Sequence, residues 1–220
     1  MIPLRDVIPS RTTPYITVTI IVLNAIAWLF ELGLPRDVLP AFLQVYGVVP
    51  AYFSPPTLVT SMFLHGSWMH VIGNMWYLWI FGDNVEDRVG HGRFIVFYLI
   101  CGMTAAFGQI LMDPTSTLPT IGASGAIAGV MGAYFVLYPQ SRVLTLIPLI
   151  IFWEIVELPA IFLLGFWFLM QLFSAGAIAV TSSSHGGGGV AFAAHVAGFV
   201  CGVGGVFVFR KRREPDTWWA

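Results

Sequence analysis

One serine and two histidines stand where a nucleophile and a base could be assembled. Ser124 lies in the run Gly-Ala-Ser-Gly at residues 122–125, at the head of an apolar segment. His70 and Asn74 stand near the start of a second apolar segment, and His195 stands near the start of a third. A serine hydroxyl becomes nucleophilic when a neutral imidazole takes its proton, so the pattern predicts a serine–histidine dyad.

Attack of a hydroxyl on an amide also creates an oxyanion, which needs hydrogen-bond donors that are already in place. His70 and Asn74 are four residues apart and therefore share one helix face. Together with the backbone N–H of Ser124 at a helix start, they are the candidate donors. No acidic residue lies at the same depth on the three segments, so a full triad is not expected.

The histidines and cysteines do not indicate a metal site. The sequence has no HExxH motif, and its histidines lack acidic or cysteine companions at ligand spacing. Cys101 and Cys201 both fall within apolar segments, where buried thiols are expected rather than a disulfide. His65 is expected to hydrogen-bond its loop to the rest of the protein. No metal, ATP or other cofactor is indicated.

The composition is that of a protein that crosses a membrane several times. Of 220 residues, 57% are hydrophobic and 10% are charged, against about 25% charged in soluble domains. The mean hydropathy is +0.82. The net charge of -1 gives no indication of nucleic acid binding.

Six apolar segments could cross a bilayer. The first is too long for the apolar core of a signal peptide, so it is expected to be a retained helix. Residues 35–65 are rich in proline and aromatic side chains and are expected in the membrane interface, whereas residues 143–157 are expected at the surface. Residues 82–93 are predicted to be a charged loop, and residues 181–189 a flexible one. The segments are residues 15–34, 67–81, 94–112, 121–138, 158–180 and 190–209.

The basic residues set the expected orientation. With six spans and a cytoplasmic N-terminus, nine of the ten lysines and arginines lie on the cytoplasmic side, and only Arg36 lies outside. A seventh span would move the four basic residues near the C-terminus outside. The expected organisation is a cytoplasmic tail (residues 1–14), a single membrane domain (residues 15–209) and a basic cytoplasmic tail (residues 210–220).

In this topology the three polar sites lie at a common depth, within about 10 Å of the outer helix ends. Small residues follow Ser124 and His195 on their segments: Gly125 and Gly129 form one GxxxG motif, and Gly198 and Gly202 form another. Such faces let two membrane helices approach closely. The alternative is that the polar side chains only hold the helices together.

The three motifs together resemble those of the rhomboid intramembrane serine proteases. They are Gly122-Ala-Ser-Gly, His70-x-x-x-Asn74 and Ala-His195-x-x-Gly198-x-x-x-Gly202. The resemblance implies Ser124 as nucleophile, His195 as base, and His70, Asn74 and the Ser124 amide as the oxyanion hole. Gly122, Gly125, Gly198 and Gly202 are the supporting positions.

The resemblance also implies an all-α, six-helix bundle with a membrane-embedded first loop, in which residues 158–180 resemble the substrate gate. It implies an integral protein of the cell (inner) membrane with its site near the extracytoplasmic side. The implied activity is cleavage of transmembrane segments of single-span or polytopic membrane proteins within the lipid bilayer.

Two features depart from the family pattern, and one of them is that the Trp-Arg pair of some members' first loop is missing here. An aromatic residue that stacks on the catalytic histidine often follows the serine by one turn, and here that residue is Ala128. Either another group orients the imidazole, or its orientation is looser and the rate of the reaction is lower. The alternative function is that of a non-catalytic rhomboid-like protein that binds or escorts transmembrane helices; the presence of both Ser124 and His195 favours catalysis.

Overall fold

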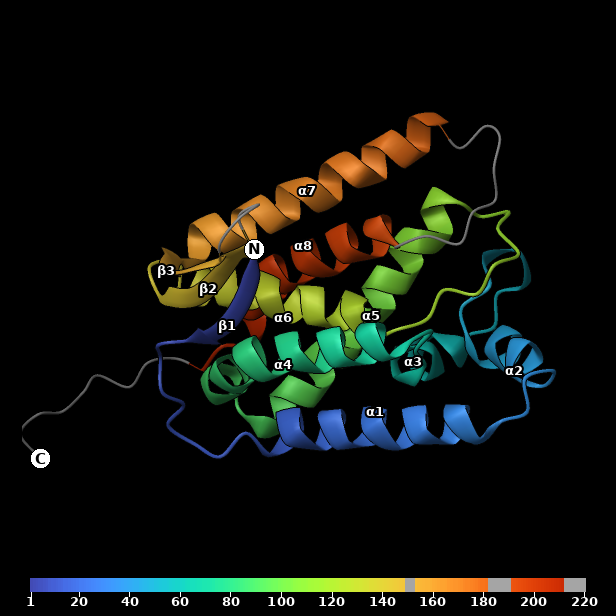
Figure 1. Cartoon of the computed structure of the whole chain (residues 1–220), viewed down its shortest axis with the longest axis horizontal. Helices are drawn as coiled ribbons and strands as arrows, with labels where there is room; N and C mark the ends of the chain where they lie inside the picture. Colours follow the sequence, from blue (N-terminus) through green and yellow to red (C-terminus); the bar gives the residue numbers. More distant parts are fainter. Residues whose placement is uncertain (149–152, 182–190, 212–220) are drawn as a thin grey trace, which may run out of the picture.

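The computed structural model describes residues 1–148, 153–181 and 191–211. Roughly parallel and antiparallel helices form the body of the molecule, and a small sheet lies at one end (Figure 1). The flexible loop predicted at residues 181–189 falls, apart from its first residue, outside the described residues, as does most of the basic tail. The helices are α1 (Tyr15–Gly33), α2 (Leu39–Tyr46), α3 (Thr57–Thr60), α4 (Trp68–Val89), α5 (His91–Met112), α6 (Ser124–Leu137), α7 (Ala160–Thr181) and α8 (Phe192–Phe209).

Among the described residues, α1, α5, α7 and α8 are long and apolar enough to cross a membrane. Helix α6 is apolar but shorter, with 14 residues. Helix α4 has 22 residues, but its last turns are charged. The protein is therefore a mostly helical membrane protein.

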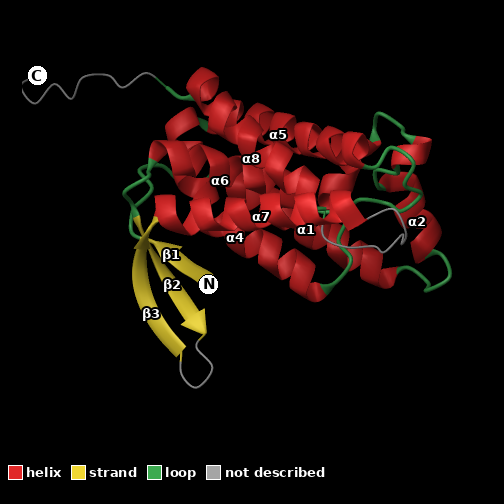
Figure 2. Ribbon diagram, turned by 90° about the horizontal axis from the view of Figure 1, so that it is seen from above, coloured by secondary structure: helices red, strands yellow, loops and turns green. Residues whose placement is uncertain are grey.

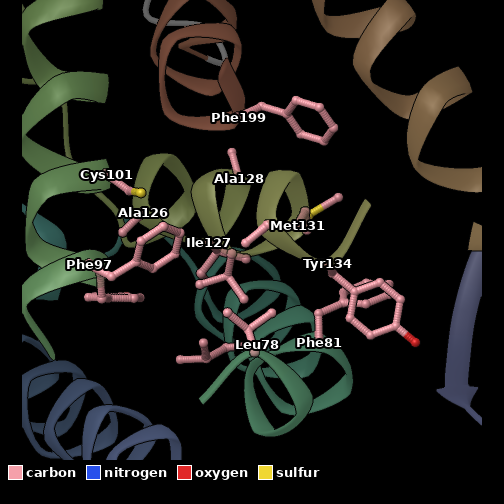
Figure 3. Close-up of a cluster of buried hydrophobic side chains, with 14 of the residues drawn as sticks. Leu78, Phe81, Phe97, Cys101, Ala126, Ile127, Ala128, Met131, Tyr134 and Phe199 are labelled. Carbon is pink, nitrogen blue, oxygen red and sulfur yellow. The ribbon is translucent and has the colours of Figure 1, made fainter. Parts of the chain in front are cut away.

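Helix α6 lies at the centre of the bundle. Every residue from Gly125 to Tyr134 is buried, because this helix consists of small and apolar residues on all sides. Figure 3 shows side chains of α4, α5 and α8 arranged around it. They include Leu78 and Phe81 from α4, Phe97 from α5 and Phe199 from α8.

Helices α6 and α8 pack with backbone against backbone. A Cβ atom on Gly198 would overlap the carbonyl group of Gly125, and one on Gly202 would overlap that of Gly129. The two GxxxG motifs therefore face each other, as their spacing predicts. This contact fixes the distance between the first turns of the two helices.

A three-stranded antiparallel sheet corrects the all-α expectation. Strands β1 (Ile2–Asp6), β2 (Arg142–Pro148) and β3 (Trp153–Pro159) pair in that order and project from one end of the bundle (Figure 2). Alternating β-branched and apolar residues give β2 and β3 strand propensity, but β1 lies in the segment expected to be a tail. Trp76 Nε1 donates to the Pro3 carbonyl at 2.7 Å and ties β1 to α4.

The predicted loop at residues 82–93 is wrong, because α4 continues to Val89 and α5 begins at His91. The reason is Glu86, whose buried carboxylate accepts hydrogen bonds from the backbone N–H groups of Ile16 and Thr17 at 3.0 and 2.8 Å. The N-terminus of α1 thus compensates the charge of Glu86 within the bundle.

The connection between α1 and α4 packs on the end of the bundle opposite the sheet (Figure 1). It contains α2, α3 and two single 3₁₀ turns, Pro50–Tyr52 and Ser61–Phe63. Val48 and Thr120 exchange two backbone hydrogen bonds of 3.0 and 2.8 Å, which join this connection to the segment before α6. Helices α4, α6 and α8 all begin at this end (Figure 1).

Candidate active site

Ser124 and His195 are in direct contact. The Ser124 Oγ lies 2.8 Å from the His195 Nε2. Ser124 is the first residue of α6, and His195 lies in the first turn of α8 with only 8% of its surface exposed. The structure thus brings together the two residues that the sequence predicts as a dyad.

The glycines beside these residues account for the contact. Gly125 follows Ser124 directly, and its carbonyl lies against Gly198, one turn after His195. A side chain at Gly198 would separate α6 and α8 at the level of the dyad. The 2.8 Å distance therefore follows from the close backbone approach between α6 and α8.

Two residues of α7, not predicted from sequence, also contact His195. The Gln171 Oε1 lies 2.8 Å from the His195 Nδ1. The Trp167 ring lies 5.8 Å from the imidazole, centroid to centroid, at 36° between the planes. Gln171 is one of few polar residues in a long apolar segment, and this is a signal that the sequence offers. The sequence does not indicate that its partner is His195.

Ala128 does not contribute to this arrangement. It is fully buried, and its methyl group points toward Phe199 of α8 (Figure 3). The contact with the imidazole that the sequence leaves open at Ala128 is made from α7 instead. Phe199 of α8 lies between Ala128 of α6 and Phe168 of α7, and its ring centroid is 4.6 Å from that of Phe168.

The predicted oxyanion donors converge on Gly122. This residue has φ of +118°, and a Cβ atom there would lie 2.6 Å from the His70 Nε2 and 3.6 Å from the Asn74 Nδ2. The backbone N–H of Gly122 donates to the Ser61 carbonyl at 2.8 Å, and this hydrogen bond holds the segment before Ser124 in place. The side chains of His70 and Asn74 thus point at the backbone of Gly122, two residues before Ser124. Ser124 is the first residue of α6, so its backbone N–H lacks an intrahelical partner.

His65 is a further residue of the site. Its Nε2 lies 3.0 Å from the Asn74 Nδ2, and its backbone N–H donates to the buried carboxylate of Glu31 at 3.2 and 3.3 Å. Burial, and then the neighbouring His70, lower the pKa of His65 to about 4. The imidazole is therefore neutral at pH 7, and its Nε2 can accept a hydrogen bond from the Asn74 amide. The sequence predicts only that His65 holds its loop.

In the described parts of the chain, no three histidine, cysteine, aspartate or glutamate side chains are grouped so that they could hold a metal ion. Cys101 and Cys201 are both free thiols. The groups gathered at this end of the bundle include a hydroxyl, imidazoles and amides, with the buried carboxylate of Glu31 beside His65. Such a set can transfer an acyl group through a serine nucleophile.

The model of the Rhomboid domain matches residues 54–212 of this chain. The chain is 32% identical to "Rhomboid-like protein 11, chloroplastic" of Arabidopsis thaliana over 114 residues, which are 48% of this chain and 39% of that protein. It is 36% identical to "Rhomboid protease GluP" of Bacillus subtilis over 85 residues, 39% of this chain and 16% of that protein. It is 33% identical to "Presenilin-associated rhomboid-like protein A, mitochondrial" of Danio rerio over 98 residues, 43% and 26% respectively. The alignments thus cover less than half of each relative.

Proposed function

The chain belongs to the rhomboid family, and from that premise we propose that it is an intramembrane serine endopeptidase. It cleaves peptide bonds in or near the transmembrane segments of other membrane proteins, single-span or polytopic. The observation that carries the proposal is the 2.8 Å contact between the Ser124 Oγ and the His195 Nε2. A hydroxyl in lipid usually bonds to a carbonyl of its own helix, whereas this one faces an imidazole from another helix.

In the first step, Ser124 Oγ attacks the scissile carbonyl carbon and its proton passes to the His195 Nε2. The carbonyl oxygen becomes an oxyanion, for which His70, the Asn74 amide and the Ser124 N–H are the donors. The imidazolium then protonates the leaving amine, and an ester to Ser124 remains. Water, deprotonated by the same imidazole, hydrolyses this ester and restores the serine.

We assign six membrane spans: α1, α4, α5, α6, α7 and α8. Residues 15–209 form a single domain, to which the N-terminal segment adds strand β1. The basic residues Arg5, Arg88, Arg142 and Arg210 all lie on elements at the sheet end of the bundle, which supports a cytoplasmic location for that end and for both termini. The dyad then lies on the extracytoplasmic side of the cell (inner) membrane.

The length of α6 supports a site below the membrane surface. Its 14 residues span about 21 Å, against about 30 Å for the hydrocarbon core. Ser124 at its outer end therefore starts about a third of the way into the bilayer, with the membrane-embedded first connection beside it. A substrate helix must unwind locally there to expose a carbonyl, which favours cleavage where helix-breaking residues occur.

The test uses purified protein in proteoliposomes with a single-span substrate. We expect the wild type to cleave it and to be labelled by a fluorophosphonate, and Ser124→Ala to do neither. Cleavage that persists in the Ser124→Ala variant would refute the assignment. A folded wild type that neither cleaves nor takes the label would favour the helix-binding alternative.

A further inference from the structure

We propose that α7 positions the catalytic base, with Gln171 as the residue that fixes the tautomer of His195. This inference rests on the proposed protease function and adds a third residue to the dyad. Gln171 does not touch the Ser124 hydroxyl; it contacts the opposite side of the imidazole, where its Oε1 lies 2.8 Å from the Nδ1.

The tautomer follows from the chemistry of the amide oxygen. A carboxamide oxygen only accepts hydrogen bonds, so the His195 Nδ1 must carry the proton and donate it to Gln171. In the neutral ring the Nε2 is then an acceptor, and it faces the Ser124 Oγ at 2.8 Å. This is the form in which the imidazole can take the serine proton. The opposite tautomer would present an N–H to the serine and could not act as a base.

Trp167 completes the support from the same helix. It lies one turn before Gln171, and its ring packs on the imidazole at 5.8 Å and 36°. Among the described residues, the contacts that orient the imidazole apart from Ser124 thus come from α7, while Ala128 of α6 faces Phe199. Helix α7 therefore supplies both a hydrogen bond to the edge of the His195 ring and an aromatic side chain against its face.

The placement on α7 has a mechanical consequence. Of the four apolar helices long enough to cross a membrane, α7 has the smallest buried share, 22% against 28–39%. Its outer face exposes large side chains such as Phe162 and Phe173. Displacement of this weakly buried helix by about 1 Å would take the Gln171 oxygen out of hydrogen-bonding range of His195. The hydrogen bond that fixes the tautomer of His195 therefore depends on the docking of α7 on α8.

The central experiment compares Gln171→Leu with Met170→Leu. Each substitution replaces a side chain of similar size with leucine. Gln171 contacts His195, whereas Met170 is 48% exposed on the outer side of α7. We expect Gln171→Leu to lower kcat about 10–100-fold, because a buried N–H loses its partner, with KM unchanged. Met170→Leu should cleave as the wild type does. Equal kcat values in the two variants would overturn the proposal.

Gln171→Glu provides a second readout that does not depend on tolerance of leucine. It keeps the acceptor oxygen and adds a negative charge, which stabilises the imidazolium. We expect the acid limb of the kcat–pH profile to move to higher pH in Gln171→Glu, while kcat of Gln171→Leu stays below the wild-type value across the range. An unchanged acid limb in Gln171→Glu would refute the contact.

The two levels of the hypothesis fail separately. If the wild type neither cleaves substrate nor takes the fluorophosphonate at Ser124, the protease assignment fails. If the wild type does both and the Gln171 variants keep its kcat and pH profile, only the positioning role fails.

Discussion

The contact between α6 and α8 can be tested at one glycine. A Cβ atom at Gly198 would lie 3.0 Å from the Gly125 carbonyl carbon and closer still to its oxygen. Ordinary separations between such atoms are about 3.5–4.0 Å. Both are backbone atoms, so no side chain can turn aside, and Gly198→Ala must move the two helices apart by about 1 Å.

That movement acts directly on the dyad, because Ser124 precedes Gly125 and His195 lies one turn before Gly198. A separation of 2.8 Å between the Ser124 Oγ and the His195 Nε2 would become about 3.8 Å, beyond hydrogen-bonding range. A 1 Å misplacement of reacting groups can cost about 10²-fold in rate. We expect Gly198→Ala to lower kcat by about that factor.

Gly204 on the same helix is the matched control, because a Cβ atom there would meet nothing within 4 Å. Both alanine variants are assayed for cleavage of a single-span substrate in proteoliposomes, and their thermal midpoints are measured. Gly204→Ala should keep the wild-type kcat. A Gly198→Ala enzyme with wild-type kcat would show that the backbone approach does not set the geometry of the dyad.

Two further predictions concern the polar groups around Gly122. Gly122→Ala would place a Cβ atom 2.6 Å from the His70 Nε2 on a backbone with φ of +118°, so kcat should fall about 10²-fold. Gly73→Ala is the control and should keep the wild-type kcat, because a Cβ atom there would meet nothing within 4 Å. Equal kcat values in the two variants would show that Gly122 is not needed to leave room for His70. The pKa of His65 is lowered from 6.5 to about 4 in the folded protein, so as the pH falls His65 is protonated in the unfolded chain before it is protonated in the folded one. The free energy of unfolding therefore decreases as the pH drops through this interval, by up to about 3 kcal/mol. Unfolding midpoints measured from pH 7 to pH 4 should decline less in His65→Gln, which still offers Asn74 a hydrogen-bond partner; identical slopes would contradict the buried neutral imidazole.

The sequence predicts much of the helical frame because helix signals are local. Length, apolarity and the spacing of small residues place α1, α5, α6, α7 and α8 to within a few residues. The small-residue face on each of α6 and α8 also follows, since residues four apart share a face whatever the rest of the fold does. Ser124 and His195 stand beside those faces and are therefore brought together.

The sheet and the extension of α4 depend on distant partners. Ile2 in β1 pairs with Leu146 in β2, and no local pattern in a short N-terminal segment specifies such a partner. Glu86 is a charged residue within the continuous helix α4, because the N-terminus of α1 lies beside its carboxylate. In both cases the stabilising group is remote in the chain.

The sequence by itself determined which residue types stand in the first turns of three helices, and hence the chemistry of a hydroxyl, an imidazole and amide donors. Only the tertiary structure decided what holds them. Gln171 and His65 contact His195 and Asn74 through the docking of α7 and of the first connection onto the bundle. A side chain's partner on another element is set by the packing of whole helices, whose rotation and depth depend on all their contacts at once.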